Sequence, residues 1–166
     1  MSQIIRKLLA EQLSWYRLQR HDFLNHWQVI MGYLQLNNPK KALEYMHRAL
    51  QGMENEQKIG QIPEDIFGAI LLGWVTRLRQ AGINTTVSYP DIMKEQSFWL
   101  DYWLEEYAEA FYGYTIDCVE SITIQSNEVS QESCAEIILG EGLACGFRFF
   151  RGGKLLREKR VKLVNK

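Results

Sequence analysis

Apolar side chains recur every three or four residues along the start of the chain, and this spacing constrains the fold more than any other feature. The positions are Leu9, Leu13, Tyr16, Phe23, Trp27, Ile30 and Leu34, with Arg20 filling the one polar position of the series. Alternating steps of four and three residues place side chains on one face of a helix. The pattern predicts one long helix from about Ile4 to Leu36.

A second helix follows a predicted turn at Asn37-Asn38-Pro39, because proline cannot continue the preceding hydrogen-bond ladder. Its apolar positions again recur every three or four residues between Lys40 and Lys58, and Gly60 follows. Two helices alone cannot cover both apolar stripes, whereas two copies of the hairpin bury all four in a four-helix bundle. We therefore expect a homodimer through residues 1–60. The alternative is that the hairpin packs only against the rest of its own chain.

The remaining chain, residues 61–166, is predicted to form a separate α/β domain, so that the fold class is α+β. We expect helices at 63–80 and 95–112, each rich in buried apolar or aromatic side chains. Strand-like segments are predicted at 85–89, 114–125, 135–139, 144–150 and 155–164. Gly140-Glu141-Gly142 is predicted to be a hairpin turn, and the basic last segment an edge strand.

Charge is distributed unevenly along the chain. The 166 residues carry 19 basic and 20 acidic side chains, yet residues 1–60 have a net charge of +3, residues 61–147 of −11 and residues 148–166 of +7. In the last segment the charges alternate with apolar residues, which favours a half-exposed strand over a nucleic-acid surface. We expect no nucleic-acid partner.

Three cysteines without a C-x-x-C pair favour a reducing compartment over a disulfide framework or a zinc site. The apolar run at the N-terminus is broken by Arg6, Lys7 and Glu11, so we expect neither a signal peptide nor membrane insertion. The expected location is the cytoplasm.

The segment Arg20-His21-Asp22-Phe23-Leu24-Asn25 carries the residues that are best suited to chemistry. At about 100° per residue, Ser14, Arg17, Asn25 and Gln28 lie within about 40° of His21, on a polar stripe well away from the apolar series. An exposed imidazole is a nucleophile that a partner's reactive group can reach. Asp22 can fix its tautomer, Asn25 can orient a water or a phosphoryl oxygen, and Arg17 or Arg20 can neutralise a phosphoryl group.

Two other histidines compete for this role. His26 lies about 140° around the helix from His21, so we expect it to pack or to form a hydrogen bond between the two helices. His47 is expected to be a solvated surface residue. A metal ion could be bound by Asp22 and His26, which lie one helical turn apart. A third ligand from Glu11, Glu44 or His47 is not expected beside them, so we predict no metal site.

Residues 14–50 resemble a known family. The run Arg20-His21-Asp22-x-x-Asn25-x-x-Gln28-Val29-Ile30 is similar to the phosphoacceptor hairpin of the sporulation initiation phosphotransferase B family, and to the H-box of related sensor histidine kinases. The resemblance implies that His21 is phosphorylated, that Asp22 and Asn25 tune the transfer, and that the hairpin dimerises. It also implies exchange of a phosphoryl group between aspartates of two response-regulator receiver domains without ATP.

The kinases of this group bind ATP through an Asn-bearing helix and glycine-rich loops, and neither motif is present after residue 60. The corresponding segment 101–110 contains no Asn, and Gly140-Glu141-Gly142 lacks the preceding Asp. Nothing here cradles a triphosphate. By the resemblance, residues 61–166 are a degenerate kinase ATPase domain that binds no nucleotide.

The expected function is therefore histidine phosphotransfer in a two-component phosphorelay. His21, Asp22 and Asn25 would carry out the transfer, Arg17, Arg20 and Gln28 would contact the receiver, and the receiver would supply Mg²⁺. The alternative is a dimeric pseudokinase that binds a response regulator without catalysis.

Overall fold

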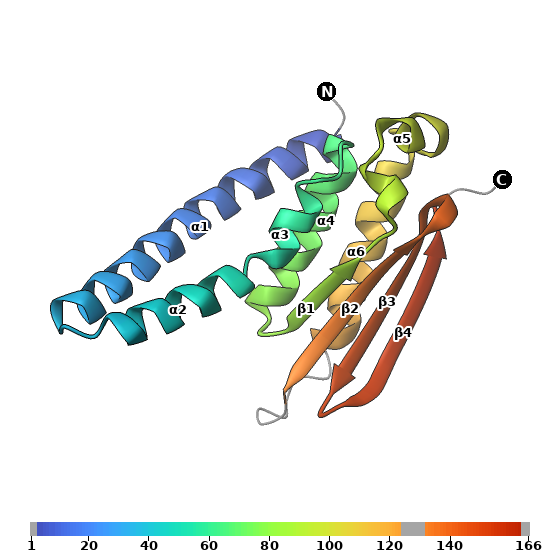
Figure 1. The fold of residues 1–166 in the computed structure, drawn as a ribbon. Helices are drawn as coiled ribbons and strands as arrows, with labels where there is room; N and C mark the ends of the chain where they lie inside the picture. The colour runs from blue at the N-terminus through green and yellow to red at the C-terminus, as the bar shows by residue number, and fades with distance from the viewer. Residues whose placement is uncertain (1–2, 124–131, 164–166) are drawn as a thin grey trace.

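A computed structural model describes residues 3–123 and 132–163 of the chain. It begins with a helical hairpin of α1 (Gln3–Gln35) and α2 (Pro39–Gln51), the tip of which projects away from the rest of the molecule (Figure 1). The predicted long first helix is confirmed. The predicted turn is confirmed as well: Asn37 has a φ of 52°, Pro39 opens α2, and the Asn38 side chain accepts a hydrogen bond from the backbone of Lys41 at 3.2 Å.

The second helix is shorter than predicted. It ends at Gln51, and a separate helix α3 (Glu54–Ile59) follows Gly52 and Met53. Glycine inside a helix costs about 1 kcal/mol relative to alanine, which favours an end at this position. The carbonyl of Gly52 accepts a hydrogen bond from Arg79 at 3.3 Å, so the break is also fastened to the following domain.

The region after the hairpin forms α4 (Asp65–Gln80), β1 (Asn84–Ser88), the short helix η1 (Asp91–Lys94), α5 (Gln96–Tyr102) and α6 (Tyr107–Thr123). The predicted helix 63–80 and strand 85–89 are confirmed. The predicted continuous helix 95–112 is wrong, because the chain becomes extended at Trp103 and starts a new helix at Tyr107. The break lets Trp99, Trp103 and Phe111 all pack against Phe67, with ring centroids 4.6–5.3 Å from that of Phe67.

The predicted strand 114–125 is also wrong over residues 114–123, which belong to α6, and residues 124–125 lie outside the described part of the chain. Within this helix Ala108, Phe111, Thr115, Cys118 and Ile122 are buried. They follow one another at steps of three and four residues, which is the period of a helix with one buried face. Burial of that face outweighs the strand preference of the β-branched residues.

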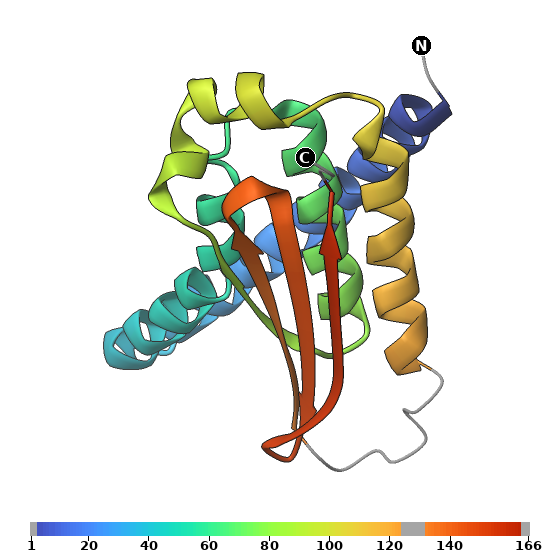
Figure 2. The ribbon, with the colours of Figure 1, turned by 90° about the vertical axis from the view of Figure 1, so that its right-hand side faces the viewer.

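The C-terminal sheet contains β2 (Ser133–Gly140), β3 (Ala144–Arg151) and β4 (Lys154–Lys162), and its strand order is β1-β2-β3-β4. The pair β1–β2 is parallel and the other two pairs are antiparallel. The last three predicted strands are confirmed, except that residue 164 lies outside the described residues. The turn near Gly140–Gly142 and the edge position of β4 are confirmed as well. Helices α4 and α6 lie against one face of the sheet, and the other face is open (Figure 2).

One buried cluster fills the space between α4, α6 and the sheet, with Phe67, Trp74, Phe111 and Phe147 at its centre. The first half of α1 contributes Ile4 and Leu8 to the same cluster. The division of the chain at residue 60 stays a prediction, but the beginning of α1 is covered by the C-terminal region.

Two side chains of α1, Trp15 and Glu11, contact the C-terminal region and hold the helix against it. Trp15 is only 8% exposed and packs on Gly73 of α4. Glu11 forms an ion pair with Arg77 of α4 at 3.1 Å and accepts a hydrogen bond from Tyr112 of α6. Arg77 also donates to Thr115 at 3.0 Å, so α1, α4 and α6 share one half-buried polar network.

Candidate functional site

His21 lies in the middle of α1, beyond the part of the helix that is fastened to the C-terminal region. Its side chain is 71% exposed, and that of the neighbouring Asp22 is 60% exposed. Arg17, Asn25 and Gln28, which helical geometry places on the same face, are exposed as well. A bulky partner can therefore approach the imidazole without displacing any part of this chain.

The Nδ1 atom of His21 faces two polar side chains of its own helix. It lies 3.2 Å from Nδ2 of Asn25 and 3.6 Å from Oδ1 of Asp22. Asn25 is thus within hydrogen-bond distance, whereas Asp22 interacts mainly through its charge. Both contacts are on the Nδ1 side of the ring, so Nε2 is the nitrogen that is directed away from them.

Apolar side chains flank this polar stripe on both sides. Leu18 and Val29 lie on one side of His21 around the helix and Leu24 lies on the other, with exposed fractions of 38–54%. Sequence reasoning missed these residues because it used the apolar pattern only to find the helix seam. They make the surroundings of His21 a mixed apolar and basic surface, which is the composition of many protein-binding surfaces.

The other two histidines differ from His21 in their surroundings. Nδ1 of His26 lies 2.7 Å from the hydroxyl of Tyr45 on α2, which confirms the predicted hydrogen bond between the helices. His47 is exposed, as expected for a surface residue.

The apolar series of the hairpin is largely uncovered in the single chain. Ten large apolar side chains that are 38–61% exposed lie along both helices: Leu9, Leu13, Tyr16, Phe23, Trp27 and Leu34 on α1, and Leu43, Met46, Leu50 and Met53 on α2 and just after it. We call this surface the seam. A continuous apolar surface of this kind marks an interaction site.

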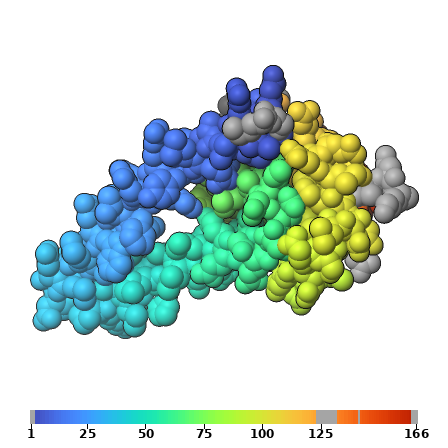
Figure 3. All heavy atoms as spheres, turned by 90° about the horizontal axis from the view of Figure 1, so that it is seen from above, coloured from blue at the N-terminus to red at the C-terminus, as the bar shows by residue number. Residues whose placement is uncertain are grey.

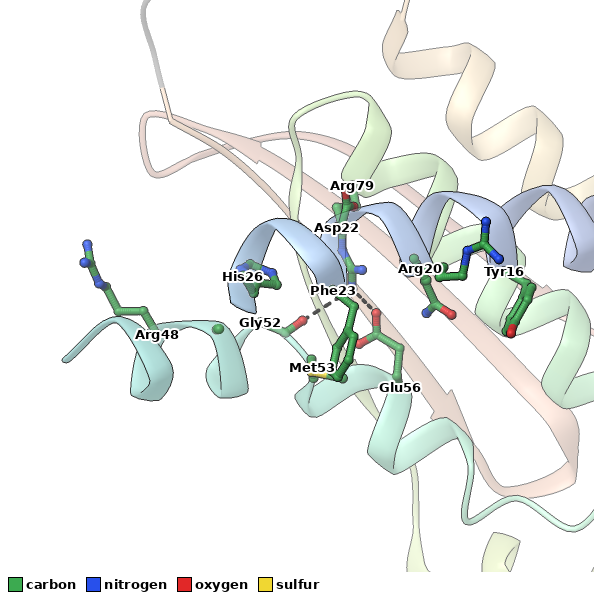
Figure 4. Close-up of a pocket in the computed structure, with 12 residues that line it drawn as sticks. Tyr16, Arg20, Asp22, Phe23, His26, Arg48, Gly52, Met53, Glu56 and Arg79 are labelled. Atoms are coloured by element: carbon green, nitrogen blue, oxygen red, sulfur yellow. Dashed lines mark hydrogen bonds and ion pairs between the residues drawn. The ribbon is translucent and has the colours of Figure 1, made fainter. Parts of the chain in front are cut away.

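A groove of about 560 Å³ opens on the seam where α1 passes the junction of α2 and α3 (Figure 3). Figure 4 shows that Phe23 points from α1 toward Met53, and that Glu56 of α3 lies beside them. Arg20, which was predicted to contact a receiver together with Arg17 and Gln28, lines this groove. This placement could be foreseen from the sequence, because Arg20 stands within the apolar series of α1.

Within residues 3–123 and 132–163, no group of three or more His, Cys, Asp or Glu side chains is arranged to hold a metal ion. In the same part of the chain no helix is long and apolar enough to cross a membrane. The three cysteines are free thiols, and burial raises the pKa of Cys118 to about 11.

Comparison with known proteins finds matches to the helical hairpin. Residues 3–62 match the model of the sensor kinase SpoOB-type alpha-helical domain. The chain is also 31% identical over 77 residues to a probable C4-dicarboxylate sensor kinase of Halalkalibacterium halodurans, an alignment that covers 43% of this chain and 14% of that protein. This chain thus matches a small part of a much longer relative. Its helical hairpin, residues 3–62, is similar to the SpoOB-type alpha-helical domain of sensor kinases, in agreement with the resemblance seen in the sequence.

Proposed function

We propose that this protein is a histidine phosphotransferase that moves a phosphoryl group between aspartates of response-regulator receiver domains through phosphorylated His21. The observation that carries the proposal is the state of His21. It is an exposed imidazole on a helix that matches a sensor-kinase-type domain, with Asn25 3.2 Å and Asp22 3.6 Å from Nδ1.

This geometry supports the following transfer. The lone pair of Nε2 attacks the phosphorus of an aspartyl phosphate on the receiver, the bond from phosphorus to the aspartate oxygen breaks, and the carboxylate leaves with its electrons. Attack by Nε2 requires the proton of the neutral ring to reside on Nδ1. The negative charge of Asp22, 3.6 Å from Nδ1, favours that tautomer, and the oxygen of Asn25 can accept the hydrogen bond from Nδ1 once its amide is rotated. Transfer to the second receiver reverses these steps.

The receiver would supply both the second reactive group and the Mg²⁺ that neutralises the phosphoryl oxygens. Arg17 and Gln28 on the His21 face, with Leu18 and Leu24 beside it, offer the contacts for its acidic pocket and its apolar rim. This chain would bring the nucleophile and its orientation, and no cofactor of its own.

We further propose that the protein acts as a homodimer in which two hairpins form a four-helix bundle. The exposed seam on α1 and α2 supports this assembly, since contact with a second copy would remove its large apolar side chains from water. His21 lies outside the seam, so both copies would keep their acceptor accessible. Sedimentation at micromolar concentration tests the proposal, and a monomer would contradict it.

The second candidate is a dimeric module that binds a response regulator without chemistry. The apolar side chains around His21 favour binding whether or not transfer follows. Incubation with a phosphorylated receiver domain separates the two functions. The phosphotransferase acquires a label on this chain that is labile in acid and stable in base, as expected for phosphohistidine, whereas the binding module forms the complex and stays unlabelled.

A further inference from the structure

We propose that the outer edge of β4 binds an extended, acidic peptide segment of a partner protein, which joins the sheet as a further strand beside β4. The site lies at one end of the strand order, in the C-terminal region and away from the tip of the hairpin (Figure 1). It depends neither on phosphotransfer by His21 nor on the proposed dimer.

The opposite edge of the sheet, at β1, is already closed by α3. The side-chain amide of Asn55 donates a hydrogen bond to the carbonyl oxygen of Thr85 at 2.6 Å and accepts one from the backbone N–H of Val87 at 3.1 Å. One side chain thus occupies the backbone groups that an added strand would use on β1.

The backbone of β4 is open at its outer edge. The N–H of Leu163 donates to the carbonyl of Leu143 on the β3 side at 3.2 Å. Residue pairs in an antiparallel ladder alternate between bonded and unbonded, so Glu158, Arg160 and Lys162 direct their N–H and C=O groups away from β3. All three residues are exposed, and no further strand pairs with β4 in residues 3–123 and 132–163. These groups can therefore pair with an added strand.

The charge of β4 indicates the chemistry of that strand. The segment Lys154–Lys162 carries five basic side chains and one acidic side chain, a net charge of +4. Its carboxylate, Glu158, is already paired with Arg160 at 2.9 Å. Lys154, Arg157 and Lys162 form no ion pair within the described part of the chain. An acidic segment would supply the carboxylates that this strand lacks.

Basic side chains lie on both faces of the sheet beside this edge. Val161 packs partly against the core, and Nζ of Lys159 donates to the carbonyl of Asp117 on α6 at 3.4 Å. Side chains alternate along a strand, so Arg160 and Lys162 lie on the opposite, open face. An added strand can thus place carboxylates opposite basic side chains on either face, and such cross-strand pairs are stabilising.

The same charges disfavour a second copy of β4 as the occupant. Two β4 strands paired edge to edge would bring basic side chains opposite basic side chains, which is destabilising. Charged edges commonly prevent self-association in this way. An acidic strand reverses the sign of the interaction, so the edge that repels its own copies attracts this partner.

A synthetic peptide tests the backbone contribution. Fluorescent, acetylated Glu-Thr-Glu-Val-Glu-Thr should bind the full chain saturably in an anisotropy titration at low salt. A version that is N-methylated at two adjacent central amides keeps the charge and blocks one N–H on each edge of the peptide. It should bind at least about tenfold more weakly. Equal binding of the two peptides would show that charge alone is recognised and would overturn the proposal.

Two variants at Glu158 separate backbone pairing from charge within the protein. Glu158→Pro and Glu158→Thr both remove a negative charge, and only the proline variant loses the outward N–H. Proline is tolerated on edge strands where the N–H faces solvent. We expect Glu158→Pro to bind the peptide about three- to tenfold more weakly than Glu158→Thr. If the proline variant fails to fold, the comparison of the two peptides on the wild-type protein still decides.

A charge reversal tests the second element of recognition. Lys162→Glu should weaken peptide binding, whereas Arg17→Glu, the same change on α1, should leave it unchanged. Equal effects of the two changes would contradict a site on β4. Vesicles containing phosphatidylserine and a short duplex DNA are tested in parallel. Binding to either one without binding to the peptide would assign the basic strand to a lipid or nucleic-acid surface and overturn the proposal, as would the absence of any peptide binding.

Discussion

The contact between Trp15 and Gly73 predicts a clear effect on stability. A Cβ atom at position 73 would lie 2.3 Å from Cη2, 3.1 Å from Cζ3 and 3.3 Å from Cζ2 of Trp15. The rigid indole is 8% exposed, so the ring as a whole has to move. Overpacking of this kind costs about 1–3 kcal/mol.

Gly68→Ala is the matched control in the same helix, because a Cβ at position 68 meets nothing within 4 Å. Replacing glycine by alanine within a helix raises the free energy of unfolding by about 1 kcal/mol through helix propensity. This contribution is the same in both variants and cancels in their difference. We therefore expect Gly73→Ala to be less stable than Gly68→Ala by about 1–3 kcal/mol in urea unfolding. In a Trp15→Phe background the difference should shrink, because the smaller ring leaves room for the methyl group. Equal unfolding midpoints for the two alanine variants would refute the packing of α1 on α4.

Three further predictions concern function. Asp22→Asn should slow phosphotransfer about fivefold or less and leave the acceptor in place, because the carboxylate is exposed and 3.6 Å from Nδ1; rapid-quench labelling measures this rate, and complete loss of label would contradict it. Association with a receiver domain should weaken as salt rises, and Arg17→Ala should reduce the slope of that dependence; on-rates that do not change between low and physiological salt would be inconsistent with electrostatic attraction. ATP with Mg²⁺ should neither raise the melting temperature nor label the protein, and a specific thermal shift would argue for a nucleotide site after residue 60.

Local periodicity predicted the hairpin well, because α1, its turn and α2 each carry their own signals. The failure at α6 has a different cause. Thr115, Ile116 and Val119 favour strands by composition, while the buried positions Phe111, Thr115, Cys118 and Ile122 follow a helical period. The period was readable in the sequence, and tertiary burial decided between the two.

The break between α5 and α6 was harder to foresee. Trp99, Trp103, Tyr107 and Phe111 are spaced by four residues, and at 100° per residue each step drifts by about 40° around a straight helix. A single straight helix would spread the four side chains over about 120°. The core partner, Phe67, lies far away in sequence, so only the folded chain shows why the helix is interrupted.

The sequence predicted which residues form the candidate site, but only part of their geometry. The angle between His21 and the seam follows from helix parameters, and the exposure of His21 agrees with it. The closer contact of Asn25 than of Asp22 with Nδ1 depends on side-chain rotamers, which sequence does not fix. The groove beside Arg20 depends on the helix break at Gly52, which the predicted second helix did not contain.

The identity of the phosphorylated residue tests the central claim most directly. A receiver domain carrying a radioactive phosphoryl group is mixed with the wild-type protein and with the variants His21→Ala, His21→Gln and His26→Ala, and the acid-labile label on this chain is measured. Both His21 variants should lose the label and keep their fold, because an exposed side chain contributes little packing. His26→Ala should keep the label, although it loses the hydrogen bond to Tyr45. A label that persists in His21→Ala and disappears in His26→Ala would contradict the account.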